Sequence, residues 1–414
     1  MSASSAPSNL TISATPLSAD AEVLSAAPPR GFWALTWLQF RKRKDAYIAF
    51  WMLGLLFMTA LSAPLLASNL PWLVTGPNGS ASPLLRDFLA PLSHLDRFYN
   101  CVLIVIMVVV PSSFIARFAM HADPARVSKT ARLCAISLFA LLFTFSVFLG
   151  GKNVRVNYKA AEAGRSAIFT LIPFGPLEDE SARSDLPPSD GHPLGSDSNG
   201  FDVLVRILHG ARISLAVGFL ATGLAVMIGI TVGSLSGYFG GWVDLFISRV
   251  IEVFICFPSL FLILTIIAIV PHRSIFWVMF AIGLTGWTGI ARLIRGEVLK
   301  VRQLDYIHAA RALGAANLRI VFRHILPNAL APVLVAATFG VAGAILTESA
   351  LGFLGLGVEP PTPSWGELLN QARQDPARLW WLMAYPGFMI FLSVTLMNLV
   401  GEGLRDAMDP KLRR

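Results

Sequence analysis

Long apolar runs constrain what this chain can fold into more than any other feature of its sequence. A helix needs about 20 consecutive apolar residues to cross the hydrocarbon core of a bilayer. The runs predict an all-α polytopic membrane protein with about eight transmembrane helices. The short alternating segments that are typical of an outer-membrane β-barrel do not match them. The predicted spans lie roughly at 47–68, 98–117, 132–150, 211–236, 246–270, 275–295, 330–355 and 380–403.

The charge content supports the same fold class. Only 14% of the residues are charged, whereas a soluble globular chain carries about 25%. The net charge of +8 fits cytoplasmic loops that are rich in lysine and arginine. Nucleic-acid binding is disfavoured, because no basic cluster alternates with exposed aromatic residues on a soluble domain.

The distribution of lysine and arginine predicts the orientation of the spans. With the N-terminus in the cytoplasm, 21 of the 33 basic residues fall inside and 11 fall outside, and Arg212 lies at a membrane edge. Cytoplasmic loops of membrane proteins carry an excess of these residues. We therefore expect both termini in the cytoplasm, as an even number of spans requires.

Composition divides the chain into five segments. Residues 1–30 are rich in Ala, Ser and Pro and are expected to form a disordered cytoplasmic tail, not a signal peptide. Residues 31–150 form an N-terminal membrane module of about three spans. Residues 151–209 form a polar outer loop, rich in Pro, Gly, Ser and Asp. A second membrane domain of five spans occupies 210–404, and 405–414 is a short cytoplasmic tail.

One segment on the cytoplasmic side is amphipathic, although the chain around it is apolar. It reads DYIHAARALGAANLRIVFRHILPNALAP, from Asp305 to Pro332. Its apolar residues recur at spacings near three and four, and Gly314 interrupts the pattern. We expect two short amphipathic helices separated by a glycine break, with the next span beginning at Pro327. A helix joined stiffly to a span can dock in a partner's groove and pass rigid-body motion to the membrane. The apolar face is predicted to hold Ala309, Ala310, Leu313, Ile320, Val321 and Ile325.

This segment resembles the cytoplasmic loop of type I permease subunits of ATP-binding-cassette importers. The loop of that family follows the pattern Glu-Ala-Ala, three residues, Gly, nine residues, Ile, any residue, Leu-Pro. His308 stands where the glutamate is usual, and His324 stands where the isoleucine is usual. The positions that match in register are Ala309, Ala310, Gly314, Leu326 and Pro327.

Four further stretches are similar to the oligopeptide/dipeptide/nickel branch of that family, specifically to its C-type permease. The resemblance covers 192–414 and implies a type I ABC importer permease core made of the five C-terminal spans. Members of the family usually have one span before the outer loop, whereas three are predicted here. The stretches are HPLGSDSNGFDVLVRILHGARISL (His192–Leu215), GYFGGWVD (Gly237–Asp244), ESALGFLGLGVEPPTPSWGELL (Glu348–Leu369) and the C-terminal GEGLRDAMDPKLRR.

The resemblance implies a permease subunit of a bacterial inner (plasma) membrane that forms half of a pore for oligopeptides or dipeptides. The implied partners are a second permease subunit in a heterodimer, two cytoplasmic ATP-binding subunits and an extracytoplasmic substrate-binding protein. No cofactor is expected in this chain, because it has no Gly-x-x-x-x-Gly-Lys-Ser/Thr phosphate loop. ATP would be bound by the partner subunits. The residues implied in coupling to the ATPase are His308, Ala309, Ala310, Gly314, Leu326 and Pro327.

Two other classes of protein remain as alternatives. A proton-coupled secondary transporter needs intramembrane charges that suffice for transport and usually has a repeated architecture, and neither is visible. A membrane-embedded hydrolase needs a catalytic motif. The sequence has neither Gly-x-Ser-x-Gly nor His-Glu-x-x-His, so we do not expect an enzyme.

Three glutamates lie in or near predicted spans, where a carboxylate is costly and is treated first as a functional candidate. For Glu348, lining of the pathway or gate and structural pairing inside the bundle remain equally open. For Glu252 and Glu297 a structural role is favoured. The structural role would be a hydrogen bond or an ion pair inside the bundle, for example with Arg292 or Arg295.

Small residues follow Glu348 at the outer end of the seventh span. Gly352, Gly355 and Gly357 are either hinges or helix-packing positions, since small residues let helices approach closely. Packing combined with an exit from the helix is favoured, because Pro360 and Pro361 follow closely.

Aromatic and turn residues mark the outer side of the second domain. Trp365, Trp380 and Trp381 are predicted to belong to an interfacial aromatic belt. The segments Gly195-Ser196-Asp197 and Asn199-Gly200 predict turns. These turns form either a plain connector or part of a docking surface for a binding protein.

The histidines are assigned to ordinary positions. His308 is expected to be a solvated substitute for the usual glutamate, with tuning of the ATPase contact by protonation as the alternative. No metal site is expected, because the others lack metal-ligand spacing. They are His192, His209, His272 and His324.

Overall fold

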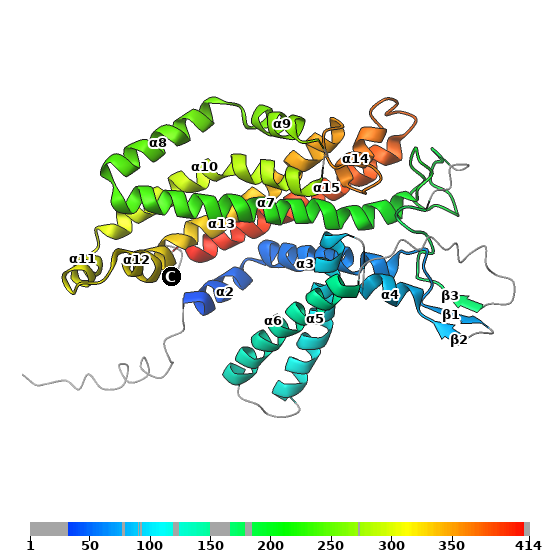
Figure 1. The fold of residues 1–414 in the computed structure, drawn as a ribbon, viewed down its shortest axis with the longest axis horizontal. Coiled ribbons are helices and arrows are strands. Elements are labelled where there is room, and N and C mark those ends of the chain that lie inside the picture. The colour runs from blue at the N-terminus through cyan, green and yellow to red at the C-terminus, as the bar shows by residue number, and fades with distance from the viewer. Residues whose placement is uncertain are drawn as a thin grey trace, which may run out of the picture.

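The computed structural model is almost entirely helical (Figure 1). Within the residues that the structure describes, seven helices are long and apolar enough to cross a membrane, and an eighth span is present if one bent pair of helices is counted. The predicted all-α architecture of about eight spans is therefore confirmed. The predicted tail at 1–30, the first part of the predicted outer loop and His272 lie outside the described residues. Those residues are 32–76, 79–89, 91, 93–118, 124–149, 166–178, 184–271 and 274–409.

The N-terminal module contains the three spans predicted for it, α3, α5 and α6. Helices α5 and α6 pack on each other as a hairpin that projects from the main bundle beside α3 (Figure 1). Most side chains of α6 face outward, as Phe148 does at 90% exposed, which suits a lipid-facing surface. The helices are α2 (Phe32–Lys42), α3 (Lys44–Leu66), α4 (Pro83–Leu89), α5 (His94–Phe118) and α6 (Pro124–Leu149).

A small antiparallel sheet links the segment between α3 and α4 to the predicted outer loop. It has the strand order β2-β1-β3 and is formed by β1 (Leu73–Gly76), β2 (Gly79–Ala81) and β3 (Ser166–Ile168). Val74 pairs with Ala81 on one side and with Ala167 on the other. The sheet therefore connects the segment after α3 to the segment that precedes the second domain.

The second domain is built around α7 and α10, which pack along each other. Gly229, Gly233 and Gly237 recur at every fourth residue of α7, and a Cβ at Gly237 would lie 2.9 Å from the backbone oxygen of Arg295 in α10. Small residues at this spacing allow helix backbones to approach closely. The helices are α7 (Val203–Phe239), α8 (Gly241–Cys256), α9 (Ser259–Ile269), α10 (Ile275–Arg302), α11 (Asp305–Ala312), α12 (Asn317–Ile320), α13 (Leu326–Phe353), α14 (Trp365–Gln371) and α15 (Trp380–Met408).

One buried arginine joins the two membrane modules. Arg212 in α7 is 1% exposed. Its guanidinium donates to the backbone oxygens of Ala60 and Leu61 in α3, both at 2.9 Å, and to the side-chain oxygens of Asp96 and Asn100 in α5, both at 2.6 Å. A buried cation is tolerated when it is paired and hydrogen-bonded in this way. The predicted membrane-edge residue is therefore the junction of three helices.

The span predicted at 246–270 is not one straight helix. Helices α8 and α9 meet at an angle of 86°. Phe257 between them is extended, with φ −97° and ψ 133°. Pro258 follows it, and a proline disfavours helical dihedrals in the preceding residue. The sequence predicted the apolar run but not the bend.

Two predicted domain boundaries fall inside helices. Helix α7 starts at Val203, before the predicted boundary at 210, because the Asp202 side chain caps it by accepting a hydrogen bond from the Val205 N–H at 3.0 Å. Helix α15 continues to Met408, past the predicted boundary at 404. Hydropathy marks where an apolar run ends, whereas a helix continues into polar residues that find partners.

The predicted interfacial belt is wrong for two of its three tryptophans. Trp365 is fully buried, Trp381 is 3% exposed, and Trp380 alone of the three is exposed, at 48%. The indole N–H of Trp365 donates to the backbone oxygen of Ile207 at 3.1 Å, and that of Trp381 donates to Ser196 at 3.0 Å. Both rings therefore pack between elements of the protein.

The glycines after Glu348 act in packing and helix exit, as favoured from the sequence. A Cβ on Gly352 would lie 2.7 Å from the backbone of Gly366 in α14, and a Cβ on Gly357 would lie 2.7 Å from the Cα of Gly352. Gly355 ends the helix with φ +76°, a conformation that favours glycine.

Replacing Gly352 with alanine is expected to destabilise the protein, because the new methyl group meets backbone that cannot rotate away. Overpacking of this kind costs about 1–3 kcal/mol. Thermal unfolding of the purified chain in detergent measures the effect. The matched control is Gly343→Ala in the same helix, where nothing lies within 4 Å of an added Cβ. Equal stability of the two variants would contradict the packing role.

Candidate functional site

The 305–327 loop has the predicted helix–glycine–helix form. Helix α11 ends at Ala312, and Gly314 adopts φ +78°. The Gly314 N–H donates to the Arg311 oxygen at 3.0 Å, and the Ala315 N–H donates to the Ala310 oxygen at 3.1 Å. This is a Schellman termination, in which a left-handed residue satisfies the last carbonyls of a helix. Gly314 therefore sets the direction in which the chain leaves α11.

One face of the loop is buried and the other presents large apolar side chains. Ile307, Ile320 and Ile325 are fully buried and anchor the loop on the bundle. Leu313, which was assigned to the apolar face, is 88% exposed beside the turn at Gly314. The other large exposed residues of this region are Leu304, Tyr306, Leu318 and Phe322. We call this set, with Leu313, the apolar loop surface.

The residues named from the family pattern divide between the two faces. His308, Ala309 and Gly314 are exposed, and Ala310 is half-buried. Leu326 is 8% exposed and belongs to the apolar core, while Pro327 is exposed in the first turn of α13. The first group can meet a partner, whereas Leu326 anchors the loop. His324 is half-buried.

The second half of the loop is continuous with a span. Helix α12 passes into a π-helical turn, η2 (Val321–Ile325), and then directly into α13. Proline is tolerated at the start of α13, because its missing N–H is not needed in a first turn. The helical backbone therefore runs from α12 into α13 without a loop between them.

The residues that contact this loop from the side were not predicted from the sequence. The Tyr238 hydroxyl, at the end of α7, donates to Asn317 Oδ1 at 2.7 Å. The Arg302 guanidinium donates to the Tyr238 backbone oxygen at 2.7 Å, and that of Arg311 lies 5.8 Å from the centre of the Tyr238 ring. Tyr238 lies in the stretch GYFGGWVD, which was noted only as a family resemblance.

Glu348 is completely buried among hydroxyl groups. Its Oε2 accepts hydrogen bonds from Ser214 in α7 at 3.0 Å and from Ser349 at 3.4 Å, and Ser364 before α14 also interacts with the carboxyl group. These contacts join α7, α13 and α14.

The ion pairs suggested for the glutamates are wrong. Arg295 instead binds Asp244 in α8 through two bonds of 2.5 and 2.7 Å. Glu252 pairs with Arg249 on an exposed helix face at 2.5 Å. Among the described residues, neither Glu297 nor Arg292 forms an ion pair.

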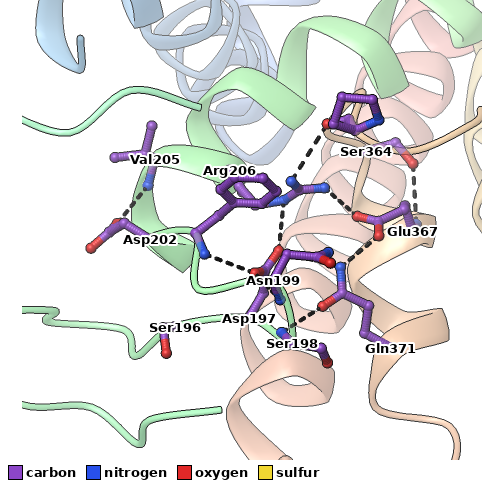
Figure 2. A network of polar contacts seen from close by, with 12 residues as sticks. Ser196, Asp197, Ser198, Asn199, Asp202, Val205, Arg206, Ser364, Glu367 and Gln371 are labelled. Carbon is purple, nitrogen blue, oxygen red and sulfur yellow. Dashed lines mark hydrogen bonds and ion pairs between the residues drawn. The ribbon is translucent and has the colours of Figure 1, made fainter. Parts of the chain in front are cut away.

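A buried polar network, which we call the Arg206 network, occupies the opposite end of the bundle (Figure 2). Arg206 in α7 is fully buried between two carboxylates. Its Nη2 lies 2.5 Å from Glu367 Oε2 in α14, and its Nε lies 3.2 Å from Asp197 Oδ2. The Phe201 ring lies against the guanidinium, 5.0 Å from its carbon. The network joins the predicted outer loop to α7 and α14.

Gln371 closes the Arg206 network. Its Nε2 donates to Glu367 Oε1 at 2.5 Å and to Asp197 Oδ2 at 3.3 Å. Asp197 Oδ1 also accepts the backbone N–H groups of Asn199 and Phe201, both at 2.9 Å. Burial raises the pKa of the Asp197 carboxyl, and Arg206 opposes that shift. The predicted turns are thus internal parts of the fold rather than a plain connector.

His192 and His209 each have a structural partner. His192 Nδ1 lies 2.8 Å from Asp202 Oδ2, and both side chains are buried. His209 Nε2 lies 3.0 Å from the backbone oxygen of Ala67. Within the ranges that the structure describes, no group of three or more His, Cys, Asp or Glu residues is placed to hold a metal ion.

Comparison with known proteins gives matches at both ends of the chain. The family model for binding-protein-dependent transport system inner membrane components matches residues 229–414. The model for the N-terminal transmembrane domain of oligopeptide transport permease C matches residues 31–91. The α5–α6 hairpin lies between the two matched segments.

Curated relatives are similar over more than half of this chain. The dipeptide transport system permease protein of Alkalihalophilus pseudofirmus is 43% identical over 253 residues, 59% of this chain and 83% of that protein. The dipeptide permease of Bacillus subtilis is 36% identical over 295 residues, 70% of this chain and 86% of that protein. Among solved structures, an inward-facing MetNI methionine ABC transporter has a TM-score of 0.40 at 22% identity, covering 49% of this chain and 97% of that chain.

Removal of the shared cation is expected to destabilise the outer end of the bundle. Arg206→Ala leaves Asp197 and Glu367 buried without their counter-charge, which costs about 3–5 kcal/mol. The measurement is thermal unfolding in detergent.

The matched control for Arg206→Ala is Arg378→Ala. Arg378 lies 3.8 Å from Asp185 and is 66% exposed, so we expect a loss of about 0–1 kcal/mol. If both variants lost the same stability, the Arg206 network would not hold this end together.

Proposed function

The chain belongs to the family of binding-protein-dependent transport system inner membrane components, and we propose that its cargo is short peptides. It is a permease subunit of an ATP-binding-cassette importer, a family of transport proteins rather than of catalytic ones. The observation that carries the proposal of a peptide cargo is the similarity to dipeptide permeases of two bacteria over more than half of this chain.

The proposed contact with the energy source is the 305–327 loop. Its apolar loop surface includes Leu313 at 88% and Leu318 at 70% exposed, and side chains of this kind gain free energy when a partner's groove covers them. His308, Ala309, Ala310 and Gly314 lie on the same stretch. The exposed position of His308 favours a solvated residue at the edge of that contact. Leu326 and Pro327 act by joining the loop to α13.

The proposed mechanism converts closure of the ATPase into tilting of the permease helices. ATP is bound by the partner subunits, because this chain has no phosphate-binding loop. Movement of the ATPase displaces the loop, and the continuous helix from α12 to α13 carries this displacement into the membrane. A second permease subunit forms the other half of the pore, and a binding protein delivers the cargo from outside.

The placement of α2 and of the end of α15 supports a common side for these helix ends and the 305–327 loop. Arg43, between α2 and α3, forms ion pairs with Asp406 and with Glu402, the latter at 3.1 Å, near the end of α15. Helices α2, α11 and α12 and the C-terminal end of α15 lie at one end of the molecule (Figure 1). We assign this end to the cytoplasm of a bacterial cell, because the positive-inside count favours it.

Of the two roles open for Glu348, we propose the structural one. The carboxyl group is enclosed and accepts hydrogen bonds from serines on neighbouring elements. These bonds need an acceptor oxygen rather than a charge, and glutamine supplies one.

Gly314→Val is expected to leave membrane insertion intact and to abolish ATP-driven uptake. Nothing lies within 4 Å of an added Cβ at Gly314, so the effect arises only from the positive φ, which disfavours a β-branched residue. The measurement is uptake of a labelled dipeptide by cells that contain the whole transporter. Gly54→Val, in α3 and also without neighbours within 4 Å, is the matched control. Normal uptake by the Gly314 variant would contradict the proposal that this loop couples the permease to the ATPase.

Glu348→Gln is expected to keep dipeptide uptake within about twofold of the unchanged protein, because a neutral hydrogen bond of similar geometry replaces each existing one. The same uptake assay measures it. A drop of about tenfold or more would mean that the charge itself is required, as lining of the pathway or gate demands.

A further inference from the structure

The corner between α7 and α8 contacts the 305–327 loop from the side, away from its covalent connection to α13. We propose that Tyr238 at this corner is a positioning residue that transmits movement of the loop to α7 and α8. The proposal rests on the function proposed above and names a further mechanical route from the same loop. The routes into the flanking helices α10 and α13 are covalent, whereas this one depends on side chains.

Tyr238 gathers contacts from three separate elements. Its hydroxyl donates to Asn317 Oδ1 in α12 at 2.7 Å, and its ring faces the guanidinium of Arg311 in α11. Its backbone oxygen accepts a hydrogen bond from Arg302 at the end of α10 at 2.7 Å. The residue is 5% exposed. Both helices of the loop therefore meet on the side chain of Tyr238, and the helix that leads into the loop binds its backbone oxygen.

The corner that carries Tyr238 is itself held firmly. Gly240 and Gly241 adopt φ values of +67° and +54°, which reverse the chain between α7 and α8. Asp244 in the first turn of α8 accepts a hydrogen bond from Ser236 in α7 and binds Arg295 of α10 at 2.5 and 2.7 Å. Because this carboxylate bridges both helices, α7, α8 and α10 are fixed to one another at the corner.

The loop is joined along the chain to α10 at its start and, through α12 and η2, to α13 at its end. Tyr238 adds a side-chain contact to the corner of α7 and α8. Without this contact, the polar link between the loop and the corner would be lost, while both covalent connections would remain. With the hydrogen bond between Tyr238 and Asn317 in place, displacement of the loop moves α7 and α8 together with the flanking helices.

The test compares variants in the complete transporter, with its ATPase and sister permease subunits, reconstituted in proteoliposomes with a labelled dipeptide. Tyr238→Phe removes the hydroxyl and keeps the ring. We expect the ATPase subunits to copurify as before and ATP hydrolysis to continue. Dipeptide transported per ATP should fall by about three- to tenfold, the size expected for loss of one neutral hydrogen bond.

Three further variants separate transmission from simple folding. Asn317→Ala removes the acceptor and should lower the transport-to-ATP ratio as Tyr238→Phe does. The double variant should do no more than either single one, because both remove the same bond. Asn317→Asp keeps an acceptor oxygen and should restore the ratio. Tyr385→Phe makes the same change near the start of α15, away from the loop, and should leave the ratio unaltered.

Two outcomes would overturn the proposal. One is a transport-to-ATP ratio in Tyr238→Phe equal to that of the unchanged protein. The other is a parallel loss of bound ATPase and of transport with the ratio unchanged, which would make Tyr238 a residue of folding or docking. Failure of the proposed function is distinguishable, because the unchanged chain would then neither bind an ATPase nor transport the dipeptide.

Discussion

A polar backbone cannot be left unpaired in hydrocarbon, and this constraint governs the whole architecture. The described spans are helices, and at two helix ends the freed carbonyls find partners within the chain. At Gly314 the freed carbonyls accept the N–H groups of Gly314 and Ala315, and at Gly355 the N–H donates to Gly352 at 2.8 Å. The breaks at the ends of α11 and α13 are therefore hydrogen-bonded turns. The first leads to the second half of the 305–327 loop, and the second leads toward α14.

The two ends of the second domain differ in what covers their side chains. At one end, the Arg206 network buries a cation between two carboxylates and ties α7, α14 and the preceding loop into one unit. The charges of Arg206, Asp197 and Glu367 are paired within the chain. At the other end, Leu313 and Phe322 are largely exposed. A surface of that kind is typical of a site that another subunit covers.

The α5–α6 hairpin lies between the two segments that the family models match. It is not loosely attached. Arg212 binds Asp96 and Asn100 of α5 while also holding the end of α3. The hairpin is therefore anchored to α7, the first helix of the second domain, and its outward face is left to the lipid.

Features that depend on neighbouring residues were predictable from the sequence. The spans follow from the length of apolar runs, and the helix–glycine–helix form of the 305–327 loop follows from its spacing and from Gly314. The family resemblance, rather than the spacing, singled out His308, Ala309 and Ala310; the first two are exposed and Ala310 is half-buried. The spacing could not say which apolar residues of the loop would be buried and which, like Leu313, would be exposed.

The sequence by itself determined that this chain is a bundle of spans with one amphipathic loop, because hydropathy and helical periodicity are local properties. Only the tertiary structure decided which side chains meet. Asp197 and Gln371 are 174 residues apart, and Tyr238 and Asn317 are 79 apart. The burial of Trp365 and Trp381 likewise depends on distant segments that cover them. A pattern in the sequence records that a residue is apolar or charged, but its partner is chosen by how the helices pack.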